Sequence, residues 1–349
     1  MKFLRFLLFP FAILYDLVTS IRNFFFDVGV FKSTSFNIPV IIVGNLSVGG
    51  TGKTPQIEYL IKLLQEKYKL AVLSRGYKRK TDEFVLVNSN HSAEDVGDEP
   101  LQYFKKFQHI DIAVDTNKVA GITTLLEQNS PEIILLDDAF QHRKVTGSFY
   151  ILLTKYTNLF SDDFLLPTGN LRESRRGAKR ADIILVTKCP QDLSKDQQEK
   201  IKDQLKKYNK EVLFTSISYA TILKGSHQIS IIKLKEYEVL LVTGIADPNP
   251  LVTFLKGKGI NFQHLKFADH HHFSSTEIKE ISKKFNELKS AKKLILTTEK
   301  DYTRLADKIK DISFIEIETT FLNNKNKYFD SIINSHIKIN SHIEQNRHC

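Results

Sequence analysis

The chain has 349 residues, a formal net charge of +10 and two cysteines, Cys189 and Cys349, which lie far apart in the sequence. This length suffices for two domains with cores of their own, and the cysteine spacing argues against a disulfide framework or a zinc site. The positive charge indicates an anionic partner: nucleic acid, phospholipid or a phosphorylated substrate. Because no signature of an RNA- or DNA-binding module is present, we expect no nucleic-acid partner.

The N-terminal segment, residues 1–30, combines many phenylalanines with few charges. Its longest uncharged run, 6–15, is shorter than the roughly 20 residues of a spanning helix, and it lacks a good signal-peptidase site. At helical spacing, one stripe is apolar and consists of Phe3, Phe6, Leu7, Leu14, Leu17, Val18 and Ile21. Another stripe is polar and consists of Asp16, Ser20, Asn23 and Asp27. The pattern predicts an amphipathic helix in a membrane interface. A helix packed on the protein's own core is the alternative.

After this segment, short apolar runs alternate with helical patterns. Buried strands joined by helical crossovers indicate a parallel sheet covered on both faces, and thus an α/β fold. The expected strands are 38–43, 69–74, 110–114, 132–137, 149–154, 182–187, 211–219, 238–243, 261–267, 293–298 and 313–318. We divide the chain into a core over 31–215, a linker over 216–236, a second, smaller α/β domain over 237–335 and a loose polar tail over 336–349.

A phosphate-binding loop follows the first strand, in the stretch VGNLSVGGTGKTP of residues 43–55. The common pattern is G-x-x-x-x-G-K-[ST], and the chain departs from it only at the first glycine. The strand before and the helix after disfavour a chance glycine-rich turn and favour a P-loop NTPase-like core that binds ATP. The expected nucleotide-binding residues are Ser47, Val48, Gly49, Gly50, Thr51, Gly52, Lys53 and Thr54. Lys53 would bridge the β- and γ-phosphates, and Thr54 would bind Mg²⁺.

Two acidic motifs accompany this loop. The strand 132–137 ends in Asp137-Asp138, where a P-loop protein needs a carboxylate to orient Mg²⁺ or its waters. The turn EDVGDEP, residues 94–100, offers Asp98 and Glu99, and a carboxylate there could accept a proton from a substrate hydroxyl. On its own, this second motif is equally an ordinary acidic turn.

Two further motifs carry cations and histidines. The stretch 166–182 is the densest positive patch, with Arg172, Arg175, Arg176, Lys179 and Arg180, and arginine suits bidentate phosphate contacts. A solvated helix face is the alternative. The stretch FADHHHFS, 267–274, has three adjacent histidines, which cannot easily share one metal ion because neighbouring side chains point in different directions. One histidine bonded to an acid and active in proton transfer is the better interpretation.

Taken together, the motifs resemble the tetraacyldisaccharide 4′-kinase family, the lipid A 4′-kinases of Gram-negative bacteria. The matching stretches are VGNLSVGGTGKTP (43–55), LSRGYKR (73–79), VGDEP (96–100), LLDDAFQH (135–142), LPTGNLRES (166–174), FADHHHF (267–273) and LTTEKDYTRL (296–305). The resemblance implies an alcohol phosphotransferase in lipopolysaccharide biosynthesis. It would use ATP and Mg²⁺ to phosphorylate the 4′-hydroxyl of tetraacyldisaccharide 1-phosphate, as a peripheral protein at the cytoplasmic face of the inner membrane. We expect a monomer.

The resemblance also implies roles for single residues. Asp98 matches the catalytic base, His270 its partner from the second domain, and Arg172 a further catalytic residue. Glu99, Asp137 and Asp138 join Thr54 near the metal, and Arg75, Tyr77, Gln141 and Glu173 match other active-site positions, while TEKD (298–301) would lie near the nucleotide or the hinge. The chain departs from the family where Asn117-Lys118 replaces Asp-Arg and Ala139 replaces glycine. The competing classes are another lipid or small-molecule phosphotransferase and a ParA-like ATPase switch, although the ParA-like class carries lysine where this chain has Val48.

Overall fold

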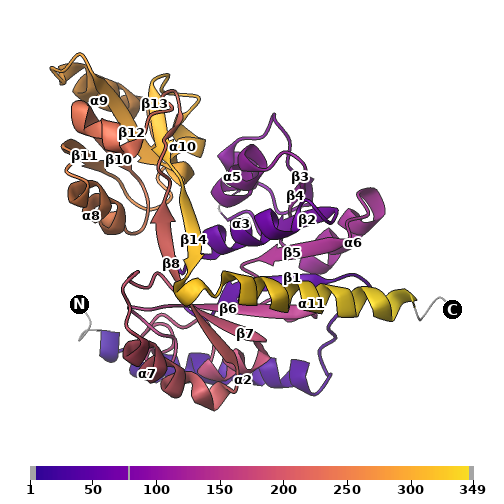
Figure 1. Ribbon diagram of the computed structural model, residues 1–349. Coiled ribbons are helices and arrows are strands. Elements are labelled where there is room, and N and C mark those ends of the chain that lie inside the picture. The colour runs from indigo at the N-terminus through magenta and orange to yellow at the C-terminus, as the bar shows by residue number, and fades with distance from the viewer. Residues whose placement is uncertain (1–4, 78, 346–349) are drawn as a thin grey trace.

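The computed structural model describes residues 5–77 and 79–345, which form two sheets with surrounding helices (Figure 1). The first sheet has nine strands in the order β14-β8-β7-β6-β1-β5-β2-β4-β3, and only its edge strands, β3 and β14, are antiparallel to their neighbours. These strands are β1 (Val40–Asn45), β2 (Leu70–Ser74), β3 (Val85–Leu86), β4 (Asp111–Val114), β5 (Ile133–Asp137), β6 (Phe149–Lys155), β7 (Ile183–Thr187), β8 (Glu211–Tyr219) and β14 (Ile317–Phe321).

The second sheet has five strands in the order β11-β10-β12-β13-β9, of which only β9 is antiparallel. Its strands are β9 (Lys224–Gly225), β10 (Glu238–Thr243), β11 (Phe262–Lys266), β12 (Lys293–Thr298) and β13 (Ile312–Ile315), and its helices are α8 (Asn249–Gly257), α9 (Ser275–Glu287) and α10 (Glu299–Leu305). The predicted α/β class, with a parallel core and a second, smaller sheet, is confirmed.

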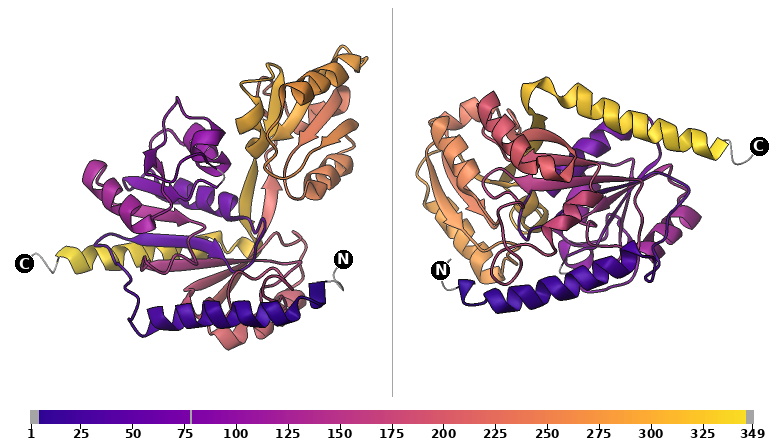
Figure 2. Two further views of the ribbon diagram at one scale, coloured as in Figure 1. Left: turned by 180° about the vertical axis from the view of Figure 1, so that it is seen from behind. Right: turned by 90° about the horizontal axis from the view of Figure 1, so that it is seen from below.

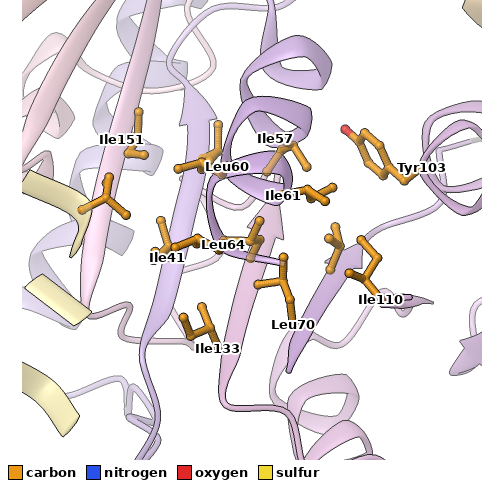
Figure 3. Packing of buried hydrophobic residues seen from close by; sticks show 14 of the residues in the cluster. Ile41, Ile57, Leu60, Ile61, Leu64, Leu70, Tyr103, Ile110, Ile133 and Ile151 are labelled. Carbon is orange, nitrogen blue, oxygen red and sulfur yellow. The ribbon is translucent and has the colours of Figure 1, made fainter. Parts of the chain in front are cut away.

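Alternating side chains of the first sheet fill a core on each face. Ile41 of β1 faces α3, whose Ile57 and Leu60 are fully buried against it (Figure 3). Ile42 points the other way and joins the cluster that contains Ile122 of α6. The helices around this sheet are α3 (Lys53–Leu64), α4 (Ala93–Val96), α5 (Asp98–Lys106), α6 (Lys118–Gln128), α7 (Lys195–Leu205) and α11 (Asn326–Gln345). Burial on both faces explains why these strands read as continuous apolar runs.

The chain passes to the second sheet along β8 and returns along β14, and these two strands pair from Thr215↔Phe321 to Tyr219↔Ile317. The predicted strand 313–318 is therefore two strands, one in each sheet. The predicted loose tail, 336–349, is wrong as far as residue 345, because α11 continues through it and buries Ile337 against the first sheet. Phe329 and Ile333 of the same helix, predicted in the second domain, also pack on the first sheet. Three apolar residues at helical spacing among polar ones were its signal.

Helix α2 (Phe9–Asp27) runs along the first sheet on the side opposite to α11 (Figure 2). Its polar stripe faces the protein, and its apolar stripe faces outward, with Phe11 62% and Leu14 59% exposed. The helix therefore packs on the protein, as in the alternative, but does so mainly through its polar stripe and Ala12. Residues 1–4 of the predicted segment lie outside the described residues. Within the described ranges, no helix is both long and apolar enough to cross a bilayer.

Candidate active site

The phosphate-binding loop connects the end of β1 to the first turn of α3. Gly49 and Gly52 have φ of +102° and +87°, a region that favours glycine. Because Gly52 is the N-cap of α3, the first-turn N–H groups have no partner inside the helix and can bind an anion. Thr187 Oγ1 donates to the backbone oxygen of Thr51 at 2.7 Å, and Val48 N donates to that of Asn170 at 2.8 Å. The predicted nucleotide residues 47–54 thus form an anchored loop, 47–52, and the first two residues of α3.

Asp137 and Asp138 lie beside this loop at the end of β5, but their environments differ. Asp137 is buried; its Oδ2 accepts a bond from Tyr103 Oη at 3.2 Å, and its Oδ1 has no partner among the described residues. Burial, with Asp138 and Glu99 nearby, outweighs Lys53 and raises the pKa of Asp137 to about 6. Burial acts on Asp138 too, but Lys53 and Arg172 outweigh it and lower the pKa of Asp138 to about 2.

Arg172 connects the Asp138 carboxylate to the end of β1. Its Nη1 and Nη2 donate to Asp138 Oδ2 and Oδ1 at 3.1 and 2.7 Å, a two-pronged contact that fixes the guanidinium plane. Nη2 also donates to the backbone oxygen of Asn45 at 3.1 Å. Lys53 Nζ lies 3.6 Å from Asp138 Oδ1. Two cations therefore converge beside the phosphate-binding loop.

Gln141 and Glu173 support this arrangement from inside the protein. Glu173 is buried and accepts bonds from Gln141 Nε2 at 2.8 Å, from Arg180 Nη2 at 2.8 Å and from Asn23 Nδ2 at 3.0 Å. These contacts hold the residue that follows Arg172. The geometry brings Gln141 and Glu173 to the site as positioning groups.

Asp98 lies in the first turn of α5 and meets the second sheet's helices there. Its Oδ2 accepts a bond from His270 Nδ1 at 2.7 Å. Arg304 of α10 donates from Nε to Oδ1 at 2.7 Å and from Nη2 to Oδ2 at 2.8 Å. Burial alone would raise the pKa of Asp98, but the bonds from His270 and Arg304 lower it to about 2. Asp98 is ionised at neutral pH.

Sequence reasoning missed Arg304, and it placed Lys300 only within TEKD (298–301), near the nucleotide or the hinge, without a role of its own. Lys300 Nζ lies 3.0 Å from His270 Nε2 and 2.9 Å from Glu99 Oε1. Both cations belong to the stretch LTTEKDYTRL, which meets the Asp98–His270 pair instead of the nucleotide loop. Their i, i+4 spacing places them on one helix face, and this was the available signal.

The neighbouring histidines have other partners. His271 Nε2 lies 2.9 Å from Glu277 Oε1, and its ring stacks on Phe267 with centroids 5.0 Å apart. Neither His271 nor His272 has a described hydrogen bond to Asp98. The geometry thus favours His270, the residue predicted from the motif register.

Arg75 and Tyr77 follow the end of β2. The Tyr77 ring meets the His270 ring edge-on at 5.2 Å. Arg75 is exposed. Burial, with smaller contributions from the nearby Arg79 and Arg75, lowers the pKa of Lys118 to about 7. Lys118 Nζ donates to the backbone oxygen of Asp115 at 3.0 Å, so the lysine at the family's arginine position points inward.

Arg79 adds a cation that sequence reasoning did not single out. All three of its guanidinium nitrogens are buried without a hydrogen-bond partner among the described residues. Burial lowers its pKa despite Asp115 and Asp82 nearby. A buried guanidinium without a partner is costly, so this side chain is suited to an anionic ligand.

The arrangement as a whole combines an anion-binding loop, cations aimed at it and an ionised carboxylate paired with a histidine. These are the parts of a phosphoryl-transfer site, in which positioning and charge stabilisation do most of the work. The carboxylate and the loop come from the first sheet, while His270, Lys300 and Arg304 come from the second.

Comparison with known proteins agrees with this geometry. Residues 4–338 match the family model described as LpxK, tetraacyldisaccharide-1-P 4′-kinase. Proteins named tetraacyldisaccharide 4′-kinase are similar along nearly their whole length: that of Flavobacterium johnsoniae is 53% identical, covering 97% of this chain and 99% of its own, and that of Bacteroides thetaiotaomicron is 43% identical, covering 96% and 93%.

A solved structure is similar as well. The crystal structure of LpxK from Aquifex aeolicus, described as an "apo" form in complex with ATP, matches with a TM-score of 0.77 and 30% identity over 96% of this chain and 99% of that one. The chain belongs to the tetraacyldisaccharide-1-phosphate 4′-kinase family.

Proposed function

We propose that Asp98, oriented by His270, accepts the proton of the sugar hydroxyl in this family's reaction, the ATP-dependent phosphorylation of tetraacyldisaccharide 1-phosphate at its 4′-hydroxyl to give lipid IVA. The observation that carries this assignment is the Asp98 carboxylate held by His270 and Arg304. A carboxylate has about four lone-pair sites, and these two residues use three of them. The remaining site, on Oδ1, is available to a hydroxyl proton.

The low pKa of Asp98 is compatible with this role. A phosphoryl-transfer transition state is loose, so the hydroxyl loses its proton only as the new P–O bond forms and ADP leaves. Asp98 therefore needs to be ionised and fixed more than it needs to be strongly basic. His270 donates its Nδ1 proton to Asp98 and keeps the carboxylate oriented.

Lys53 and Arg172 would stabilise the charge that spreads over the transferred group. Both are anchored by Asp138, so their positions are set before the substrate arrives. Preorganised cations of this kind lower the barrier because they need little rearrangement during the reaction.

Mg²⁺ fits the carboxylates of this site. Asp137 Oδ1 is buried without a partner, and the neighbouring carboxylates of Asp138 and Glu99 raise the pKa of Asp137 beyond the effect of burial. A divalent cation with oxygen ligands would relieve this repulsion. We propose that Asp137 and Thr54 hold the ion, with Glu99 and Asp138 nearby, and that it neutralises phosphate charge when bound. Glu99 also belongs to a possible ligand group with Asp98 and His270.

The substrate's 1-phosphate needs a second anion site. We propose that Arg79, whose guanidinium has no hydrogen-bond partner among the described residues, and the exposed Arg75 bind it, because Lys118 is turned towards Asp115. Replacing Arg79 with Gln should raise KM for the disaccharide more than it lowers kcat. An unchanged KM would remove Arg79 from the substrate site.

The apolar face of α2 is the proposed contact with the membrane, in the peripheral manner expected for an acylated substrate. Deleting residues 1–25 would also remove the inward bonds of Tyr15 and Asn23 to the Arg172 segment, so point variants are the cleaner test. Combined Phe11→Ser, Leu14→Ser and Val18→Ser changes should reduce cosedimentation with vesicles. Unchanged cosedimentation would refute this contact.

One assay tests the reaction itself. Purified protein with Mg-ATP and tetraacyldisaccharide 1-phosphate, in detergent micelles, should give a product phosphorylated at the 4′-oxygen. Lipid-linked sugars without that hydroxyl should give none. Transfer to such sugars at an equal rate would instead indicate a different lipid phosphotransferase.

A further inference from the structure

The basic stretch 172–180 is divided by the fold into two sets of cations. Arg172 and Arg180 point inward, to Asp138 and Glu173. Arg175, Arg176 and Lys179 remain on the far side of the chain, on the short helix η1 (Arg175–Arg180). The catalytic arrangement does not use this second set.

These cations border a groove of about 500 Å³ between α2, the segment 163–165, η1 and the short helix η2 (Lys206–Tyr208). Its wall is apolar and includes Phe9, Ala12 and Ile13 of α2, together with Phe164 and Leu171. Ile13 is 58% and Phe164 40% exposed, so the wall is continuous with the outward apolar face of α2.

The rim of the groove is positively charged. Arg176, Lys179 and Lys207 are exposed, and within the described residues none of them has an ion-pair partner. Arg175 is fixed by two bonds to the backbone oxygen of Asp163 and lies over the Phe164 ring, 5.7 Å from its centroid.

Two acids also line the groove, but each has hydrogen-bond donors of its own. Asp163 accepts bonds from the amide of Asn170 and from the Phe164 backbone, and Asp16 accepts one from Ser20. The acids are therefore occupied by neutral donors, whereas the exposed cations face solvent. The groove has an excess of positive charge above an apolar wall.

We propose that this groove binds a single anionic phospholipid of the membrane surface. Its phosphodiester would lie among Arg176, Lys179 and Lys207, and one acyl chain would lie along Ile13 and Phe164. Cations beside an apolar surface match the two halves of such a lipid. The proposal rests on the proposed docking of α2 at the membrane.

The groove is separate from the phosphoryl-transfer site. Leu171 lines the groove, whereas the next residue, Arg172, turns its guanidinium to Asp138. The segment 171–173 thus forms a wall between the two, so the lipid in the groove and the sugar at Asp98 can be bound together.

The test uses a fluorescent reporter, because the chain has no tryptophan. Ile13→Trp places one tryptophan at the groove. Titration with dihexanoyl phosphatidylglycerol below its micelle concentration should give a saturable blue shift of its emission. Dihexanoyl phosphatidylcholine should bind at least fivefold more weakly, and glycerol phosphate should give no shift.

Charge variants in the same background locate the site. Arg176→Gln, Lys179→Gln and Lys207→Gln together should weaken phosphatidylglycerol binding by about fivefold per cation. The matched control, Lys256→Gln with Lys279→Gln and Lys283→Gln, removes the same charge from exposed lysines of the second sheet's helices and should leave binding unchanged.

Four results would overturn the proposal: no blue shift with phosphatidylglycerol, equal binding of the two phospholipids, equal weakening in the control variant, or competitive displacement of phosphatidylglycerol by the disaccharide substrate, which would make the groove an acyl subsite of the reaction. Kinase activity of the charge variant in detergent micelles should stay normal. If the native protein does not phosphorylate the disaccharide in micelles, the proposed function is refuted. If the protein is active but the Ile13→Trp variant gives no blue shift, only the proposed phospholipid site is refuted.

Discussion

Helix α5 carries an ionic cluster at each end, and both clusters connect it to α10. At its first turn, Asp98 meets His270 and Arg304, and the neighbouring Glu99 meets Lys300. At its last turn, Lys106 Nζ lies 2.8 Å from Glu58 Oε2, 2.8 Å from Glu299 Oε2 and 3.2 Å from Glu316 Oε1. The first cluster has acids on α5 and cations around them, while the second cluster has one cation among acids.

The two ionic clusters differ in their exposure to solvent. Lys300 and Glu99 are each 21% exposed at the side chain, whereas Lys106 and its partners Glu58 and Glu299 are at most 9% exposed. A substrate can therefore reach the first cluster but not the second. The same residue types on the same helix pair are thus proposed to serve chemistry at one end and attachment of the second sheet at the other.

The largest effect should follow from removing Lys106. Lys106→Met would leave the buried side chains of Glu58 and Glu299 without their cation, whereas Glu316 would keep Lys224, and the change should cost about 3–5 kcal/mol of unfolding free energy. Denaturant unfolding measures this loss. The folded fraction should keep its turnover; a variant with normal stability but low turnover would show that this cluster is catalytic.

Replacing His270 should lower turnover and leave stability nearly unchanged, the opposite of the Lys106 variant. His270→Gln should lower turnover by about 100-fold, with little change in unfolding free energy, because the ring is near the surface of the cluster. His271→Gln and His272→Gln serve as controls and should stay within a few-fold of the native rate. A large loss at His271 alone would overturn the assignment.

A substitution at Arg304 distinguishes a role in turnover from a role in attaching the second sheet. Arg304→Lys keeps the charge but loses the two-pronged contact with Asp98, and we expect about a tenfold lower kcat with an unchanged KM for ATP. Steady-state kinetics in both substrates measures this split. Equal losses in kcat and in stability would mean that Arg304 only attaches the second sheet.

The smallest effect concerns pH. Burial and the neighbouring Glu58 outweigh Lys106 and raise the pKa of Glu299 to about 7, above its ordinary value of 4.5. The folded state then binds the proton more tightly than the unfolded chain, so this group's contribution to stability falls as pH rises from about 4.5 to about 7. Glu299→Gln should flatten that fall in unfolding free energy, and an unaltered slope would contradict the raised pKa.

Much of the molecule could be predicted from the sequence because its signals are local. Apolar runs of the right length marked the buried strands, and Gly52-Lys53-Thr54 after β1 marked the nucleotide loop. The tail was mispredicted since the polar residues of α11 outnumber the three that are buried. Strand 313–318 was mispredicted because a division between two sheets leaves the apolar run unbroken.

The cations around Asp98 could not be found in this way. Arg304 lies 206 residues from Asp98 in the chain, and nothing in LTTEKDYTRL states which carboxylate it faces. The inward polar stripe of α2 is similar: Asn23 is an ordinary polar residue until the fold places Glu173 opposite it. Such pairings depend on tertiary structure, which periodicity does not report.

The most direct test of the account is single-turnover phosphoryl transfer by Asp98→Asn, measured beside ATP binding. Asn keeps the shape of the side chain but cannot accept the hydroxyl proton. We expect transfer to the 4′-hydroxyl to slow by about 100- to 10 000-fold while the affinity for ATP stays within a few-fold of the native protein. Transfer at the native rate with normal ATP binding would contradict the assignment of Asp98 as the proton acceptor.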